Sequence, residues 1–321
     1  MDSTALRRRT VLAAGAAGLV LPAFAQSDRP VRFILPNATG SGVDAITRAA
    51  QQALGKALGH PVIVDNQPGA GGILGLQALA RSAADGSTLG IVSNNVVIFP
   101  SVLKSMPFDM PGDFTPIAVV GYTPVVLVVN PKVPAKDAKE MVALLKSRNG
   151  DMTFASGGNG TILHLASEMF LDEAKAKARH IPYKGVGPMV TDLIGGQVDF
   201  GAAALPSVQG HLKSGALRAI GIATAQRAAA APEIPTFIEQ GMNYVVEAWF
   251  AVIGPKGLPP AEVQRIHAAV VSAFNDAEVK DAMAKQGNVI SVGPADKAMP
   301  FFRSELAKYA QIVKKAGVEA Q

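Results

Sequence analysis

The stretch Thr153-Phe-Ala-Ser-Gly-Gly-Asn-Gly-Thr-Ile-Leu-His-Leu-Ala-Ser-Glu-Met-Phe170 joins a short apolar run to a helical apolar pattern through a turn of small polar residues. Residues 153–155 predict a buried strand, and residues 160–170 predict a helix. A strand, a short turn and a helix form the repeating unit of α/β proteins with a parallel sheet. The stretch therefore predicts an α/β fold.

The same order of elements recurs on both sides of this stretch. Before it, apolar runs predict strands at 31–35, 62–64, 88–92 and 125–129, and helical spacing predicts helices at 42–58, 69–80 and 136–146. After it, strands are predicted at 179–183, 198–203, 217–223 and 249–253, with helices at 188–194, 208–213, 261–275, 277–287 and 300–316. The chain is thus expected to hold two α/β units of similar size.

The order of these units predicts a split first domain with an inserted second domain. Residues 26–128 and 254–321 are assigned to domain I, residues 129–253 to domain II, and two crossover strands are expected between them. The closing helices are expected to return to the first unit.

The first residues, 1–25, have the layout of a cleaved export signal. Leu6-Arg-Arg-Arg-Thr-Val-Leu12 supplies the charged region, an apolar core follows, and Ala23-Phe-Ala25 ends it. We expect export to the periplasm with cleavage near Ala25. The arginines also resemble a twin-arginine signal, and the export route stays open. A retained anchor is the alternative, but the apolar run is shorter than the roughly 20 residues needed to span a bilayer.

Composition narrows the chemistry. The chain has 321 residues, a formal net charge of +5 and no cysteine. Its basic residues are scattered, so we expect no nucleic-acid partner, and the absence of cysteine excludes disulfides and thiolate metal ligands. The five histidines form no ligand cluster. His164 and Glu168 share a helical face but make an incomplete site, so we expect neither metal nor cofactor.

Two glycine-rich turns stand before predicted helices, at residues 37–44 and 156–161. A helix start exposes N–H groups without partners and carries partial positive charge, so a turn from each domain facing one cleft would make a carboxylate clamp. The alternative is that these residues serve only as turn and cap residues. A phosphate site is disfavoured, because neither turn contains G-x-x-x-x-G-K-[ST].

Two charged residues near these turns, Asp44 and Lys184, each have two possible roles. Asp44 either caps its helix or contacts the ligand, and Lys184 either neutralises an anion in the cleft or is solvated. Catalytic patterns such as G-x-S-x-G and H-E-x-x-H are absent from the sequence. The sequence therefore favours binding over catalysis.

Several motifs, in order and spacing, resemble the Bug family of extracytoplasmic solute-binding proteins, the receptors associated with tripartite tricarboxylate transporters. The resemblance covers nearly all of the chain after the signal. It is carried by Gly59-His-Pro-Val-Ile-Val-Asp-Asn-Gln-Pro-Gly-Ala-Gly-Gly72, Ala84-Asp-Gly-Ser-Thr-Leu89, Val128-Val-Asn-Pro131, Ala155-Ser-Gly-Gly-Asn-Gly-Thr161, Ile181-Pro-Tyr-Lys-Gly185, Asp192-Leu-Ile-Gly-Gly-Gln-Val198, and Trp249 with Gly254-Pro255.

The resemblance implies a two-domain periplasmic binding protein of the type II, Venus-flytrap class, with a carboxylate, an amino acid or a related small aromatic molecule bound between the domains. It maps binding to the turns at 36–44, 94–95 and 156–161. The candidate ligand-binding residues are Asn37, Thr39, Ser41, Gly42, Val43, Asp44, Asn94, Asn95, Ser156, Asn159, Gly160, Thr161, Lys184 and Ala203.

Two departures from the family pattern bear on the ligand. Asn37 stands where the family has an aromatic residue, and Gly42-Val43 replaces a hydroxyl pair before Asp44. The family also often has an Asp within the stretch that here reads Ala202-Ala-Ala204. Without that partner for an ammonium group, a mono- or dicarboxylate is expected rather than a free amino acid.

The function expected from sequence is a periplasmic receptor, monomeric and without turnover, that captures a small organic anion and delivers it to membrane permease subunits. A receptor that signals through a sensor kinase is one alternative. A periplasmic enzyme on the same scaffold is the other.

Overall fold

The computed structural model describes residues 29–318 and residue 320, with only the backbone of Ala70, so the expected export signal at 1–25 lies outside the described residues. Within that described part, no helix combines the length and apolar character that crossing a membrane requires.

The described chain alternates strands and helices along most of its length. In chain order the elements are β1 (Val31–Leu35), α1 (Gly42–Leu58), β2 (Val62–Asn66), the 3-10 turn η1 (Ala70–Gly72), α2 (Ile73–Ala80), β3 (Thr88–Ser93), α3 (Asn95–Val102), β4 (Phe114–Val129), α4 (Ala138–Arg148), β5 (Thr153–Ser156), α5 (Ile162–Ala174), β6 (Arg179–Pro182), α6 (Val186–Gly195), β7 (Phe200–Ala204), α7 (Leu205–Lys213), β8 (Arg218–Ile222), β9 (Glu247–Pro255), α8 (Pro260–Asn275), α9 (Ala277–Gln286), β10 (Val289–Ile290) and α10 (Ala295–Ala316).

These strands form one ten-stranded sheet in the described residues, with the order β2-β1-β3-β9-β4-β7-β5-β6 and with β8 and β10 also paired to β4. The pairs β1–β2, β1–β3, β5–β6 and β5–β7 are parallel. The pairs that β4 and β9 make are antiparallel. The predicted parallel units therefore exist, and antiparallel strands join them.

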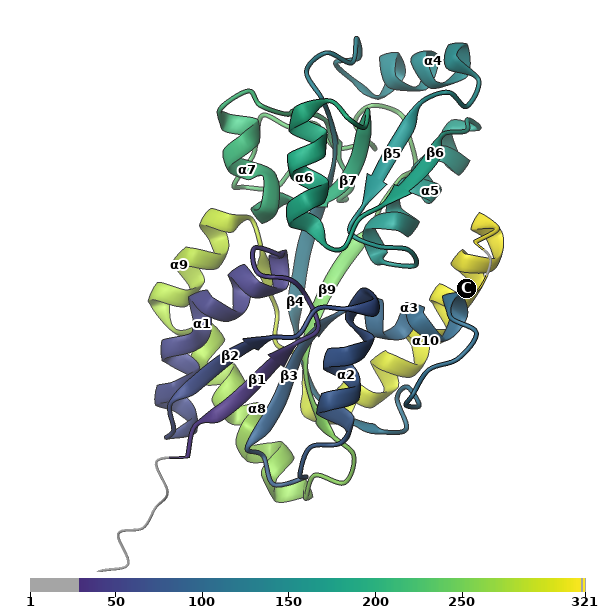
Figure 1. Ribbon diagram of the computed structural model, residues 1–321. Coiled ribbons are helices and arrows are strands. Elements are labelled where there is room, and N and C mark those ends of the chain that lie inside the picture. The colour runs from purple at the N-terminus through teal and green to yellow at the C-terminus, as the bar shows by residue number, and fades with distance from the viewer. Residues whose placement is uncertain (1–28, 319, 321) are drawn as a thin grey trace, which may run out of the picture.

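Two lobes result, with β4 and β9 running between them (Figure 1). We call the part around β1–β3 the first lobe and the part around β5–β8 the second lobe. The first half of β4 pairs with β9, and its last residues, from Val125 to Val129, pair with β7 and β8. Helices α8 and α9 pack on α1, and α10 packs on α3, so the C-terminal helices cover the first lobe.

The predicted boundaries at residues 129 and 254 remain a prediction. The stretch Ala248–Ile253 of β9, placed in domain II by sequence, pairs with β3 and with the first half of β4. These residues therefore pair within the sheet of the first lobe. The chain returns from the second lobe before residue 248, ahead of the predicted boundary at 254.

Strand β4 and helix α3 differ from the sequence-based prediction, and the short strand β10 was not predicted. Strand β4 begins at Phe114, well before the predicted 125, and contains Pro116 and Pro124. A register shift follows Pro116, as at a bulge, and a second lies before Gly121, whereas Pro124 pairs in register with Glu247 at the first residue of β9. Residues 95–102 form α3, where only a turn was expected, and all apolar side chains of this helix are buried. Without a polar face, the helix has no amphipathic pattern to detect.

Candidate functional site

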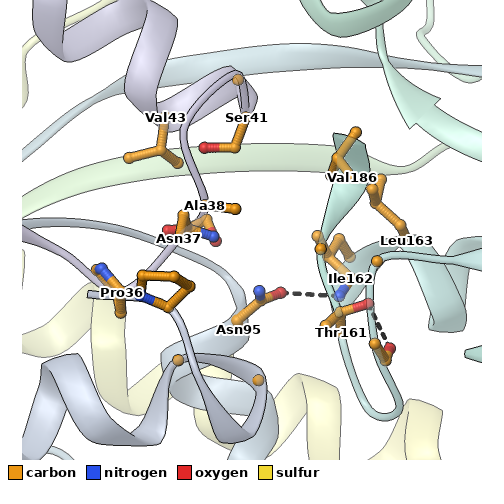
Figure 2. Close-up of a pocket in the computed structure, with 18 of the residues that line it drawn as sticks. Pro36, Asn37, Ala38, Ser41, Val43, Asn95, Thr161, Ile162, Leu163 and Val186 are labelled. Atoms are coloured by element: carbon orange, nitrogen blue, oxygen red, sulfur yellow. Dashed lines mark hydrogen bonds between the residues drawn. The ribbon is translucent and has the colours of Figure 1, made fainter. Parts of the chain in front are cut away.

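A cavity of about 700 Å³ lies between the two lobes. Its wall comes from the turn after β1, the turn before α2, the start of α3, the turn after β5, and the segment joining β6 to α6. Figure 2 shows Pro36, Asn37 and Ser41 on one side and Ile162, Leu163 and Val186 on the other. The turns that the sequence singled out in two distant segments therefore face one space.

Most of the predicted site residues lie on this wall, and some do not. Those on the wall are Asn37, Ser41, Gly42, Val43, Asn95, Asn159, Thr161 and Lys184. Those off the wall are Thr39, Asp44, Asn94, Ser156, Gly160 and Ala203. The second group divides into structural supports of the wall, a core residue and an exposed residue, Thr39.

Asp44 holds the first-lobe turn in shape. Its carboxylate accepts hydrogen bonds from the Gly40 N–H at 3.0 Å, Arg48 Nε at 2.9 Å and Asn66 Nδ2 at 3.0 Å. Its own N–H donates to Ser41 Oγ, the N-cap of α1. With both oxygens engaged and the side chain buried, Asp44 is a structural support of the turn.

The same turn leaves donors for a ligand. The Asn37 amide makes no hydrogen bond within the described residues, and its Oδ1 is buried without a partner. The Ser41 hydroxyl accepts from Asp44 but donates to no described atom. A buried amide without partners is costly unless a ligand or water pairs with it. The first-lobe turn therefore presents two free donor groups, the Asn37 amide nitrogen and the Ser41 hydroxyl, together with one buried acceptor, Asn37 Oδ1.

The second-lobe turn is internally satisfied instead. Ser156 Oγ donates to the Gly158 carbonyl at 3.0 Å and accepts from the Gly158 N–H at 3.2 Å. The Thr161 hydroxyl, the N-cap of α5, donates to the same carbonyl at 2.8 Å. These bonds fix the backbone of the turn and leave these hydroxyls no free hydrogen, whereas the Asn159 side chain on the wall makes no hydrogen bond to a described atom.

Two stacked histidines support this turn from behind. The rings of His164 and His180 stack at 3.8 Å, and His180 also stacks on Phe154. His164 Nδ1 accepts the Gly160 N–H at 3.1 Å, and His180 Nε2 lies 2.7 Å from Ser156 Oγ. Burial, and then the neighbouring His164, lower the pKa of His180 to about 3. His180 is therefore neutral at ordinary pH.

Asn95 and Gly160 connect the lobes. Asn95 Oδ1 accepts the N–H of Ile162, the first residue of α5, at 2.8 Å (Figure 2). Gly160 has a positive φ of 68°, and a Cβ there would overlap the Val102 side chain of α3. Because these contacts join the two lobes, the structure shows a closed arrangement of the lobes. Asn94 points away from the cavity and donates to the Glu247 carbonyl and to Tyr309.

The electrostatics of the wall favour an anion. The helices α1, α5 and α6 all begin on it, with Gly42, Ile162 and Val186 as their first residues, and the N-terminal end of each helix carries partial positive charge. Among the described wall residues there is a cation, Lys184 at the exposed rim, and no carboxylate. A negative ligand therefore meets no negatively charged side chain on the described wall.

The expectation for Ala203 requires a correction. Ala203 is fully buried and packs in the core of the second lobe, because it points to the opposite face of β7 from Ala202. The residue on the wall is Ala204, the N-cap of α7, which a Cβ at Gly42 would approach at 3.3 Å. The place where a carboxylate would reach the cavity is thus one residue later than predicted.

The apolar part of the wall was not identified from sequence. Phe99, Leu103, Leu163 and Val186 line the cavity. Buried leucine, valine and phenylalanine in a helix read as core, and nothing local distinguishes a wall from a core. The described residues contain no group of three or more acidic, histidine or cysteine side chains arranged for a metal ion.

Comparison with known proteins places this geometry in a family. The family described as "Tripartite tricarboxylate transporter family receptor" matches residues 46–318. Protein BugT of Bordetella pertussis is 35% identical over 308 residues, which cover 94% of both chains.

Solved structures share the fold. Periplasmic binding protein BugD has a TM-score of 0.85 at 27% identity, covering 91% of this chain and 99% of its own. R. palustris Rpa4515, solved with adipate, has 0.88 at 25%, covering 92% and 100%. MatC from Rhodopseudomonas palustris, solved with bound malate, has 0.80 at 26%, covering 89% and 99%. The fold is that of two-domain periplasmic binding proteins, as predicted.

Proposed function

This chain belongs to the tripartite tricarboxylate transporter family of receptors, and from that premise we propose that it captures a mono- or dicarboxylate between its lobes and delivers it to the permease subunits of such a transporter. As a member, it is a solute-binding receptor. The identity of the ligand, the absence of turnover, a monomeric state and the permease contact are parts of the proposal.

One observation carries the proposal. On the first lobe, Asn37 Nδ2, the Ser41 hydroxyl and Asn95 Nδ2 line the cavity and donate to no described atom. A carboxylate has only acceptors at neutral pH, so it satisfies donors of this kind without leaving any of its own groups unpaired. The relatives solved with adipate and malate support the same ligand class.

The absence of an acidic residue at position 204 bears on the charge of the ligand. Ala204 stands beside Gly42 at the start of α1, where a carboxylate would pair with an ammonium group. We propose that the ligand therefore carries no cation. In calorimetry, glutarate and succinate should bind more tightly than glutamate and aspartate. Tighter binding of the amino acids would reject this part of the proposal.

Closure links binding to transport. A ligand that contacts both lobes shifts the population toward the closed state, which the membrane partner can then recognise. Calorimetry with a panel of organic acids tests binding, and Asn37→Ala should weaken it about tenfold, as expected for the loss of one hydrogen bond to a charged group. Thr39→Ala is the control, since Thr39 is exposed on the same turn and lies off the wall. Unchanged affinity in Asn37→Ala would place the ligand elsewhere.

Location and partner need separate tests. We propose a periplasmic location after cleavage near Ala25, which fractionation and N-terminal sequencing of the mature protein would check. The twin-arginine route predicts that replacing Arg8 and Arg9 by Lys blocks export. Capture of membrane partners with the liganded receptor separates uptake from signalling, because only the former recovers permease subunits.

A further inference from the structure

The polar side chains of the cavity wall fall into two groups. The first group donates no side-chain hydrogen to a described atom and comprises Asn37, Ser41, Ser93, Asn95, Asn159 and Lys184. Others on the same wall donate their single hydrogen inside the protein and have none left for a ligand. These are Thr123 to Asn288 Oδ1 at 2.8 Å, Thr161 to the Gly158 carbonyl at 2.8 Å, Tyr183 to Asp192 Oδ2 at 2.7 Å, and Trp249 to Glu305 Oε2 at 2.7 Å.

The remaining wall is largely carbon. Phe99 and Leu103 belong to α3 and the residue after it, and Leu163 and Val186 come from the second lobe. Figure 2 shows Leu163 and Val186 on the side of the cavity opposite Pro36 and Val43. The wall therefore combines free polar groups, most of them on the first lobe, with apolar surfaces contributed by both lobes.

Resting on the proposed function, we infer that the ligand is an organic acid whose carbon body bears no hydroxyl or ammonium group, such as an unsubstituted aliphatic chain or a bare aromatic ring. Its carboxylate takes the free donors of Asn37, Ser41 and Asn95. Its carbon body lies against the apolar wall, where Thr123, Thr161, Tyr183 and Trp249 have no hydrogen left to donate.

The cavity volume favours a ligand with a long carbon chain or a ring over a short acid. Its roughly 700 Å³ would hold on the order of 20 water molecules at their liquid volume. A short acid leaves much of that space to water, whereas a longer carbon chain removes both its own surface and the wall from water. Each buried methylene should tighten binding about fourfold. A hydroxyl placed against this wall loses its hydrogen bonds to water and should weaken binding about tenfold or more.

The test is calorimetry on the full mature protein with matched acids. One series lengthens the chain: succinate, glutarate, adipate and pimelate. Two pairs differ by a hydroxyl: succinate against malate, and phenylacetate against mandelate. Affinity should rise along the series and fall at each hydroxyl. If malate and mandelate bind as tightly as their partners or more tightly, the inference is wrong while the proposed function stands. If no acid binds, the proposed function fails.

A matched pair of variants locates the effect. Val186→Thr keeps the side-chain shape and puts a hydroxyl on the wall, so it should weaken adipate severalfold and narrow the gap between succinate and malate. Val289→Thr makes the same change on exposed β10, away from the cavity, and should change neither. Equal losses for adipate and malate in Val186→Thr would overturn the inference, as would no loss at all. Thermal midpoints of both variants show that the fold is intact.

Discussion

The first-lobe turn and the second-lobe turn look alike in sequence and act differently in the structure. Each places glycines and hydroxyl residues before a helix. In the first, Asp44 takes over the internal bonds, and Asn37 and Ser41 stay free to face the cavity. In the second, Ser156, Thr161 and His164 are all bonded within the turn. The first turn thus keeps the Asn37 and Ser41 donors free toward the cavity, whereas the second presents a fixed backbone and, among its polar side chains, Asn159.

The largest expected effect comes from Gly160→Ala. A non-glycine residue at its positive φ costs about 1–3 kcal/mol, and the new methyl would overlap Val102 across the lobes. Closure should therefore be hindered and ligand affinity should fall about a hundredfold, measured by calorimetry. The double variant with Val102→Ala should recover part of the loss. Full affinity in Gly160→Ala would show that the lobes do not meet there in the bound state.

Asp44→Ala should be the next largest and should act on stability. Removing the carboxylate leaves Gly40, Arg48 and Asn66 without their acceptor, at a cost of about 2–3 kcal/mol in the free energy of unfolding. Denaturant unfolding of the apo protein measures this, and Asp151→Ala is the control, because Asp151 is exposed and its carboxylate pairs with no described group. If affinity falls while apo stability is kept, Asp44 contacts the ligand after all.

His180 predicts a dependence on pH. Its pKa is about 3 in the folded protein, below its usual 6.5, so the unfolded state binds the proton first. The stabilising contribution is complete above pH 6.5 and is lost as the pH falls toward 3. His180→Phe, which keeps the stacking, should therefore lose less stability on acidification, by about 1 kcal/mol at pH 5 after allowance for solvent screening. If the thermal midpoints of the parent protein and His180→Phe fell equally with decreasing pH, this prediction would be contradicted. His211→Phe serves as the control.

Thr161→Ala tests the second turn more gently. It removes the N-cap of α5 and a bond to the Gly158 carbonyl, so the free energy of unfolding should fall by about 1 kcal/mol. Ligand affinity should fall only indirectly, to the extent that the backbone of the turn changes its conformation. Thr161→Ser keeps the cap and should restore both. A large loss of affinity without loss of stability would mean that the hydroxyl binds the ligand directly.

Lys184→Gln should have the smallest effect. Lys184 is exposed at the rim, where water and salt screen its charge. We expect a change in affinity of less than about threefold at physiological salt and a somewhat larger one at low salt. A tenfold loss independent of salt would place the ammonium group in direct contact with the ligand.

Sequence predicted more of the fold than of the site. Buried strands such as 31–35 and amphipathic helices such as 42–58 carry their own periodicity and were found with little error. Only the continuous apolar run 125–129 of strand β4 was predicted, and the earlier part, which contains Pro116 and two register shifts, was missed. Helix α3 was missed because its apolar residues are buried all around.

The sequence predicted the site as two turns, and the structure distinguishes the roles of the individual residues in them. Sequence named Asn37, Ser41 and Thr161, since small polar residues before a helix are recognisable. It placed Ala203 on the wall in place of Ala204, because the face of a strand residue depends on its register in the sheet. It could not separate Asp44 as a support from Asn37 as a free donor, since both are polar residues of one turn.

By itself the sequence determined the alternation of strands and helices and the positions of the glycine-rich turns, because these follow from local periodicity and backbone preferences. Only the tertiary structure decided which hydrogen bonds each turn already makes, and hence which donors remain for a ligand. A side chain such as Asn37 is free only because no residue from elsewhere in the chain reaches it. That depends on contacts between segments far apart in sequence, and no local pattern encodes them.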